Sequence, residues 1–269
     1  MALHGGLVYV VIGKYADGTP TDIDAGLVRV VKGSSKTATI TRKGIGDYTK
    51  VKFSSYSFPV SFEGDVTSAA LLNAILNSDQ DKMYIKLHDI QYDNFVASSL
   101  ELSASRDDPL TYSVEGEACD ASSITAVTGT EPGTFFVMAE ATLTVGGVSG
   151  EISEFSISSE RSLTPIPNTS GSSLVERMKP SDFGTGPWTH TAKFNVVPDS
   201  SLAEALDGAW DPSGSQLSFT ISFVDAYDDT HTLTISGSGG IWESTEVTVD
   251  AEKEVVIIKN MVLETLSFS

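Results

Sequence analysis

The chain has 269 residues, 40% of them hydrophobic, and a formal net charge of −19 at pH 7. This length suits one large domain or two domains of about 130 residues. The acidic balance argues against simple nucleic-acid binding, which needs a basic surface, and a single cysteine, Cys119, excludes an intramolecular disulfide. The apolar run near the start is only seven residues long and follows no basic stretch, so we expect no signal peptide, no membrane association and synthesis in a cytoplasm.

From residue 27 onward, apolar and polar residues alternate with a period of two, which predicts β-strands. Too few helical segments are present to supply the crossovers of a parallel sheet, so we expect hairpins and meanders in an all-β fold with short flanking helices. The predicted strands are 27–33, 36–43, 47–64, 82–90, 94–105, 110–118, 135–145, 150–160, 188–197, 216–225, 230–238, 244–251 and 254–268.

Two segments interrupt the alternation. Residues 67–79 and 199–210 each open with Ser, Thr or Asp and then place apolar side chains at helical spacing, Ala, Leu and Ile in the first segment and Ala and Leu in the second. Each segment predicts a short amphipathic helix that packs on a sheet.

The order strand, helix, strand, Tyr-Asp turn, strand occurs twice, with Tyr92-Asp93 and Tyr227-Asp228 at the two turns. This repeat predicts two tandem β-sandwich or barrel domains, residues 1–130 and 131–269. A Ser, Thr, Gly and Pro-rich segment, 120–133, is the expected join. Residues 161–188 form a second irregular run, and long irregular loops are usually functional or disordered.

Charge is distributed unevenly along the chain. Residues 131–269 contain six basic and 20 acidic side chains, whereas 29–52 contain a single acidic one, Asp47, among seven basic ones. An acidic body with one basic segment suits self-association through complementary surfaces. A solvated loop with a chance cluster of lysines is the alternative. The basic residues are Arg29, Lys32, Lys36, Arg42, Lys43, Lys50 and Lys52.

No catalytic motif is present, and we expect neither enzyme activity nor a cofactor. The histidines are isolated, and exposed strand positions are expected for His190 and His231. The segment 225–230 contains several Asp residues but not the Gly and the distal Glu of a calcium-binding loop. It therefore predicts a turn. We therefore expect no metal site.

Two other functions stay open. Trp188, Trp210 and Trp242 could contribute to a glycan-binding platform, although packing in the core or an interface is the favoured interpretation, because Trp210 closes the second predicted helix and Trp188 begins a strand. The alternative function is therefore a two-domain surface or adhesion protein that binds glycans. Carboxylates from distant strands could also meet in the acidic cleft of a hydrolase.

Residues 141–206 resemble the tail-tube (major tail) proteins of long-tailed phages and related archaeal viruses. The resemblance lies in the strand "EFSISSE" (154–160), the long loop, the strand "GTGPWTHTAKFNV" (184–196) and the helix that follows. The first half is similar through "YSFPVSFEGDVTSAALLNAIL" (56–76) and "YDNFVASSLELS" (92–103).

The resemblance implies a β-sandwich with a flanking helix whose sheets join around a ring, and rings that stack into a hollow tail tube for DNA delivery. Two tandem units imply a trimeric ring with pseudo-sixfold symmetry; a ring of six chains is the alternative if residues 1–66 are not a true tube unit. The resemblance also implies that the protein is located in the virion tail, that its partners are proteins such as tail-tip, tape-measure or sheath proteins, and that DNA only passes through as cargo. An acidic lumen would repel the DNA phosphates.

The resemblance also suggests roles for particular segments. Strands 53–62 and 188–197 would contribute to the inner sheet. Basic side chains of the first-half segment and of the 161–188 run would reach acidic surface on neighbouring rings. The expected inter-ring contacts are Lys36, Arg42, Lys43, Lys50, Arg177 and Lys179.

Overall fold

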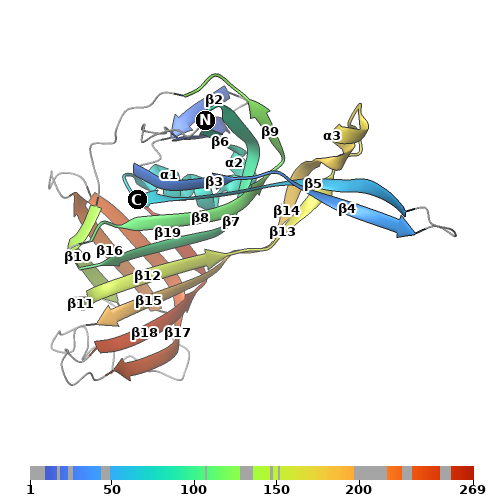
Figure 1. Ribbon diagram of the computed structural model, residues 1–269. Helices are drawn as coiled ribbons and strands as arrows, with labels where there is room; N and C mark the ends of the chain where they lie inside the picture. Colours follow the sequence, from blue (N-terminus) through green and yellow to red (C-terminus); the bar gives the residue numbers. More distant parts are fainter. Residues whose placement is uncertain are drawn as a thin grey trace.

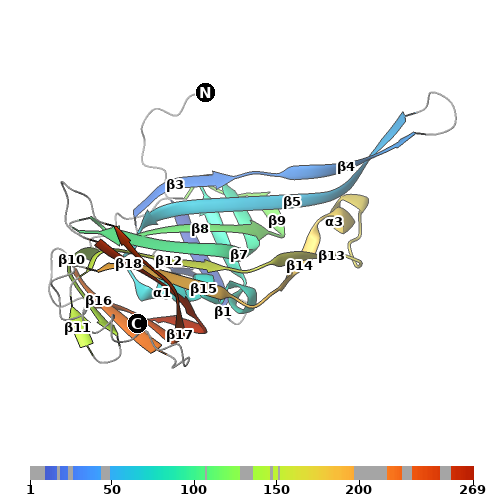
Figure 2. The same cartoon turned by 90° about the horizontal axis from the view of Figure 1, so that it is seen from below.

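The computed structural model shows an antiparallel β-protein with two projections on one side (Figures 1 and 2). The all-β prediction with few short helices is confirmed. The structure describes residues 10–16, 19–23, 27–43, 49–106, 108–127, 136–145, 148–150, 152–196, 217–225, 232–248 and 256–269.

One long sheet extends through both halves of the chain, and every pair of neighbouring strands in it is antiparallel. Strand β7 of the first half pairs with β12 of the second half, so the sheet is continuous across the middle of the chain (Figure 1). In spatial order its strands are β3 (Leu27–Gly33), β5 (Thr49–Asp65), β8 (Thr111–Ala118), β7 (Ile90–Ser105), β12 (Ile152–Glu160), β15 (Thr189–Val196), β18 (Val256–Leu263) and β17 (Thr232–Thr248).

Two short sheets branch from the long one through β7 and β17, which are long enough to pair in both. The first contains β2 (Thr19–Ile23), β1 (Val10–Ala16), β6 (Met83–Leu87), β7 and β9 (Asp120–Ser123) in spatial order. The second contains β11 (Val148–Gly150), β10 (Phe136–Val145), β16 (Leu217–Asp225), β17 and β19 (Thr265–Phe268).

The same strand order recurs in the two halves. Strands β3-β5-β8-β7 and β12-β15-β18-β17 each run first, second, fourth, third in chain order, and the two short sheets correspond strand for strand. Single-residue bulges recur as well: Arg29 in β3 and Ser153 in β12, then Ser98 in β7 and Glu243 in β17.

The Tyr-Asp pair lies inside a strand, which corrects the predicted turn. Tyr92 and Asp93 pair with Ile85 and Tyr84, and the chain turns earlier, at His88 and Asp89. Tyr227-Asp228, the second predicted turn, lies outside the described residues.

The strands alternate because one side of each sheet is buried. Large apolar side chains of both halves form one hydrophobic cluster, in which Phe155 packs on Phe223 at 5.4 Å and Phe194 on Phe219 at 5.1 Å between ring centroids. The cluster crosses the β7–β12 junction, where Leu102 lies opposite Ile157.

Two helices, α1 (Ala69–Leu76) and α2 (Ser78–Asp81), confirm the helix predicted within 67–79. Ser68 is the N-cap, although its side chain makes no capping hydrogen bond. Helix α1 buries Leu, Ala and Ile side chains and connects the halves, because Asn73 Nδ2 donates to the carbonyl of Phe268 at 2.9 Å. The second predicted helix, 199–210, lies outside the described residues.

Both projections arise between the first two strands of a half (Figure 1). In the first half, β4 (Lys36–Lys43) pairs with the start of β5. In the second half, the run predicted to be irregular, 161–188, is instead an ordered arm: β13 (Leu163–Pro167), α3 (Leu174–Met178) and β14 (Pro180–Thr185). A capping box between Ser173 and Glu176 starts α3, a local signal that the sequence reading missed. Residues 120–123, from the predicted join, form β9.

Candidate functional surface

The outward side of the long sheet is polar from β8 to β15. Side chains alternate between the two sides of a strand. Opposite the core here, Val96 is apolar and packs under the arm, and the other side chains are Ser, Thr, Asn, Glu or Lys. We call this set the polar face; it consists of Thr111, Ser113, Glu115, Glu117, Ser99, Glu101, Ser103, Glu154, Ser156, Ser158, Glu160, Thr189, Thr191, Lys193 and Asn195.

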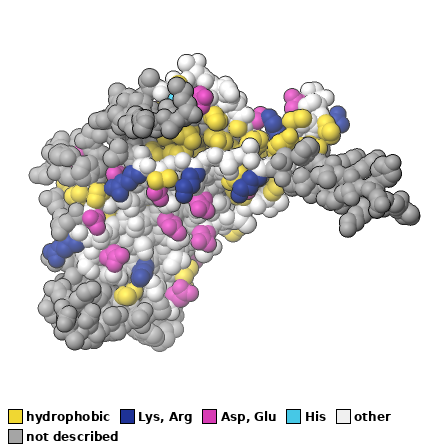
Figure 3. Space-filling view, in the orientation of Figure 1, with side chains coloured by type: hydrophobic (Ala, Val, Ile, Leu, Met, Phe, Trp, Pro, Cys, Tyr) yellow, Lys and Arg dark blue, Asp and Glu magenta, His cyan; other side chains and the backbone are white. Residues whose placement is uncertain are grey.

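The polar face is acidic, with five glutamates against one lysine. Figure 3 shows Asp and Glu side chains across its middle, with Lys and Arg along the side where β3 lies. Short hydroxyl and amide side chains fill the space between the glutamates and bond one another: Asn195 Nδ2 donates to Glu154 Oε2 at 2.6 Å, and Ser103 Oγ lies 3.1 Å from Thr111 Oγ1. Such a surface repels phosphate and offers no apolar site for adsorption.

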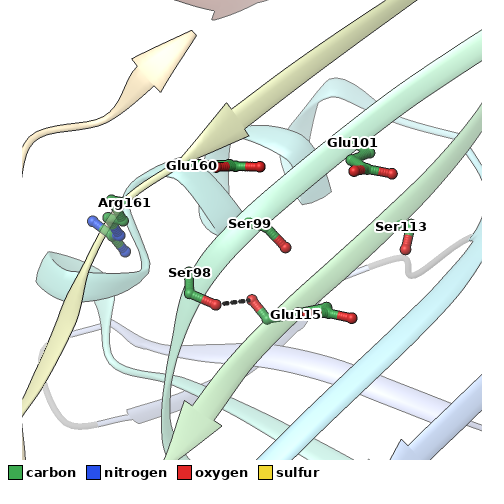
Figure 4. A pocket seen from close by; sticks show the side chains of 7 residues that line it. All are labelled: Ser98, Ser99, Glu101, Ser113, Glu115, Glu160 and Arg161. Carbon is green, nitrogen blue, oxygen red and sulfur yellow. Dashed lines mark hydrogen bonds between the residues drawn. The ribbon is translucent and has the colours of Figure 1, made fainter.

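Three of the glutamates, Glu101, Glu115 and Glu160, line a shallow depression of about 360 Å³ over the β7–β12 junction (Figure 4). They come from three neighbouring strands, and serine side chains separate them. Ser98 Oγ, beside them, donates to the carbonyl of Glu115 at 3.1 Å. The sequence reading did not select these glutamates, although their alternation with buried Leu100, Val114 and Ser159 is visible in it.

Arg161 holds the two halves together beside this depression. Its residue is only 8% exposed, and its guanidinium donates at 2.8 Å to the carbonyl of Ala97, to Asp79 Oδ1 and to Ser78 Oγ. It also lies 4.3 Å from the ring centroid of Trp188. Segment 161–188 therefore begins with a buried arginine that stabilises its own chain, and this side chain is not available to contact a neighbouring ring.

The predicted inter-ring residues have different surroundings. Lys36 is exposed at the start of β4. Along the hairpin backbone, Arg42 pairs with Lys50 and Lys43 pairs with Thr49. The side chains of Arg42, Lys43 and Lys50 lie outside the described part of the structure. On the arm, exposed Arg177 donates to the carbonyl of Gly171 at 2.8 Å, and Lys179 forms an ion pair with Asp120. Residue Lys179 thus tethers the arm to β9.

The expected exposed position of His190 is wrong. This residue is 5% exposed, its ring stacks on Trp188, and its Nδ1 lies 2.8 Å from Ser159 Oγ. Burial lowers the His190 pKa, because the charged ring loses its water. Predictions for His231, Trp210 and most of 225–230 fall outside the described residues.

Acid should therefore weaken the fold through His190. Because the pKa of His190 is lower in the folded chain, the unfolded chain binds the extra proton, so stability falls as pH drops below about 6.5, by at most about 1.4 kcal/mol per pH unit from this residue. Urea unfolding at pH 7.5 and 5.5 should show a smaller loss for His190→Gln than for the unmodified chain. Equal losses would contradict this role.

The remaining candidates are structural. Trp188 packs on the core and donates from its indole nitrogen to the carbonyl of Leu76 at 3.0 Å, as the packing interpretation predicts. Cys119 is buried at the end of β8, and burial raises the pKa of its thiol to about 11. Among the residues described, no cluster of His, Cys, Asp and Glu could hold a metal ion, and no helix is long and apolar enough to cross a membrane.

A family model described as phage tail tube protein matches residues 14–262. No curated protein matches the sequence. The matched segment contains the entire polar face and extends over both halves of the long sheet, well beyond half of the chain. The chain therefore belongs to the phage tail tube protein family.

Proposed function

We propose that the chain, as a member of this family, is a structural component of a phage virion tail. We propose that it assembles into rings that stack into the hollow tail tube through which DNA is delivered. The observation that carries the proposal is the acidic polar face on one continuous sheet, flanked by the outer edges of β3 and β17. Neither β3 nor residues 241–248 of β17 pairs with another described strand along that edge.

We further propose that the two halves are duplicated tube domains, residues 1–130 and 131–269, and that three chains close a ring with pseudo-sixfold symmetry. The recurring strand order and bulges support this division. A ring also removes the exposed edges of the long sheet, which otherwise invite uncontrolled pairing. The predicted inner strands, in β5 and β15, both lie in this sheet.

The polar face would line the lumen. DNA carries closely spaced phosphates, so a wall of glutamates and hydroxyls lets it pass without binding. This role needs no catalysis or cofactor, and we propose that the chain has neither. Its partners would be further copies of itself and other tail components, such as tail-tip, tape-measure or sheath proteins, after synthesis in the host cytoplasm.

Electron microscopy of the purified chain at high concentration tests the proposal. Hollow tubes or rings with threefold or pseudo-sixfold end views are expected, and sixfold rings of single chains would contradict the trimer. Uniform single particles, also after addition of a tail-tip initiator, would favour the alternative of a glycan-binding surface protein. A panel of immobilised glycans would then test that alternative.

The β4–β5 hairpin and the arm are the proposed contacts between rings. Both extend from the same side of the sheet, and the arm exposes Leu174 and Val175 on α3. The basic hairpin would meet acidic surface on the next ring, with Lys36, Arg42, Lys43 and Lys50 contributing, and Arg177 and Lys179 would contribute from the arm.

Charge reversal at the hairpin should shorten the tubes. We expect Arg42→Glu with Lys43→Glu to reduce mean tube length and to make the remaining tubes dissociate at lower salt, because attraction between rings becomes repulsion. The circular dichroism spectrum and unfolding midpoint of the monomer should not change. Tube lengths measured in micrographs at 50 and 300 mM salt check this, and unchanged length and salt resistance would refute the contact.

A further inference from the structure

The junction between the two halves supplies a template for the junction between chains. Within one chain, β7 and β12 pair so that Ser158 lies opposite Glu101 and Ser156 opposite Ser103. The pairing continues past the strand end, where the amide of Arg161 donates to the carbonyl of Ser98 at 2.9 Å. This junction is a complete antiparallel interface between one half and the other.

The outer edges of the long sheet belong to the corresponding strands, β3 and β17. The bulges fix the correspondence residue by residue: Ser34 is five residues after Arg29, as Ser158 is five after Ser153. Likewise, Glu246 is three residues after Glu243, as Glu101 is three after Ser98.

We propose, on the basis of the proposed ring, that β17 of one chain pairs antiparallel with β3 of the next chain in the register of the β7–β12 junction. Ser34 then lies opposite Glu246, and Lys32 opposite Thr248. The partner is a second copy of this chain, and three such junctions alternate with three internal ones around the ring.

The charges of the two edges are complementary. The β3 edge carries exposed Lys32 and exposed Arg29, the latter paired with Asp65 of its own chain at 2.6 Å, and exposed Lys36 begins β4. The second part of β17 contains Glu243 and Glu246. Opposite charges on two edges that must meet favour this partner over pairing of either edge with its own copy.

The burial of a side chain at the internal β7–β12 junction supports the same partner. Val96 of β7 is 2% exposed because it packs with Phe183 and Leu163 of the arm, across the internal junction. Its counterpart in β17, one residue before Trp242, is Ile241, which is 52% exposed. The arm corresponds to the β4–β5 hairpin, so the hairpin of the next chain is the element expected to cover Ile241.

Paired cysteines test the register. Directly opposed residues in antiparallel strands have Cα atoms about 4.5–5.5 Å apart, within reach of a disulfide. Tubes of the Ser34→Cys, Glu246→Cys chain are oxidised with diamide and run on a denaturing gel without reductant. We expect a covalent ladder that ends at three chains. The thiol of Cys119 is buried and should not form a disulfide in this experiment.

Two matched variants serve as controls. Ser158→Cys with Glu101→Cys places the same pair in the internal junction and should close within one chain without a ladder. Ser35→Cys with Glu246→Cys is displaced by one residue, which puts the side chains on opposite sides of the sheet, and should give no ladder. Tubes without a ladder from the first pair, while the internal pair closes, would overturn the register but leave the tube function intact.

A second measurement covers the case in which the cysteine pair prevents assembly. Ile241→Cys should react with a maleimide at least tenfold more slowly in tubes than in unassembled chains, and equal rates would overturn the proposal. Failure of the unmodified chain to form any ring would instead overturn the proposed function itself.

Discussion

Replacement of Arg161 by alanine is expected to lower the free energy of unfolding by about 2–4 kcal/mol, because it removes the hydrogen bonds of a buried guanidinium whose ion-pair partner, Asp79, is itself partly exposed. The change removes three hydrogen bonds and leaves the carbonyl of Ala97 without its side-chain donor, while Ser78 Oγ keeps only the bond from the Ala97 amide. For a chain of this size, the melting temperature should fall by on the order of 10 °C.

Urea unfolding of the unassembled chain measures this effect. The midpoint should move to lower urea with an unchanged slope, because the fold itself persists. Arg161→Lys keeps the charge but cannot reproduce three directed bonds, so an intermediate loss is expected. Arg177→Ala is the matched control: this arginine is exposed and should cost less than about 1 kcal/mol. Similar losses for Arg161→Ala and Arg177→Ala would show that Arg161 does not hold the halves together.

The strands could be predicted from the sequence because apolar and polar residues alternate wherever one side of a strand is buried. In "LTYSVEGEA", Tyr112, Val114 and Ala118 enter the core while Glu115 and Glu117 face outward, and both facts follow from the period of two. The acidic face could not be assembled in the same way. Glu101 and Glu160 become neighbours only through the β7–β12 pairing, which joins residues about sixty positions apart and leaves no local signal.

Local polarity misled the sequence interpretation at two places. His190 lies between threonines, which suggested exposure, yet its strand turns this position toward the core, where Ser159 meets the ring. The polar, proline-containing run after Arg161 suggested an irregular loop, yet it forms a hairpin arm with a capped helical turn. In both cases the conformation depends on pairing with strands that are distant in the sequence, and no short segment of the sequence reveals that pairing.

Reversal of the glutamates at the depression should turn a DNA-repelling tube into a DNA-binding one. The variant is Glu101→Lys, Glu115→Lys and Glu160→Lys, all on the polar face and none in the core. A ring of three such chains would present three new lysines from each chain to passing phosphates. Contacts with about 6–10 phosphates make affinity fall roughly 10³–10⁵-fold between 50 and 200 mM salt.

Co-sedimentation of tubes with a short labelled DNA duplex at these two salt concentrations measures the change. Unmodified tubes should leave the DNA in the supernatant at both. The lysine variant should bind DNA at 50 mM salt and release it at 200 mM. The corresponding Glu→Gln variant has nearly the same shape without added positive charge, and it should bind weakly or not at all.

A further control separates the lumen from the rest of the surface. Thr19→Lys, Thr21→Lys and Asp89→Lys add positive charge at exposed positions on the first short sheet and its turn, across the core from the polar face. Binding to this variant as strong as to the face variant would mean that added charge alone explains the result. Binding by the face variant, followed by protection of the DNA from nuclease digestion, would instead require that DNA enters the tube, because only an enclosed duplex escapes the enzyme. The glutamates would then be the groups that keep the passage free of bound DNA.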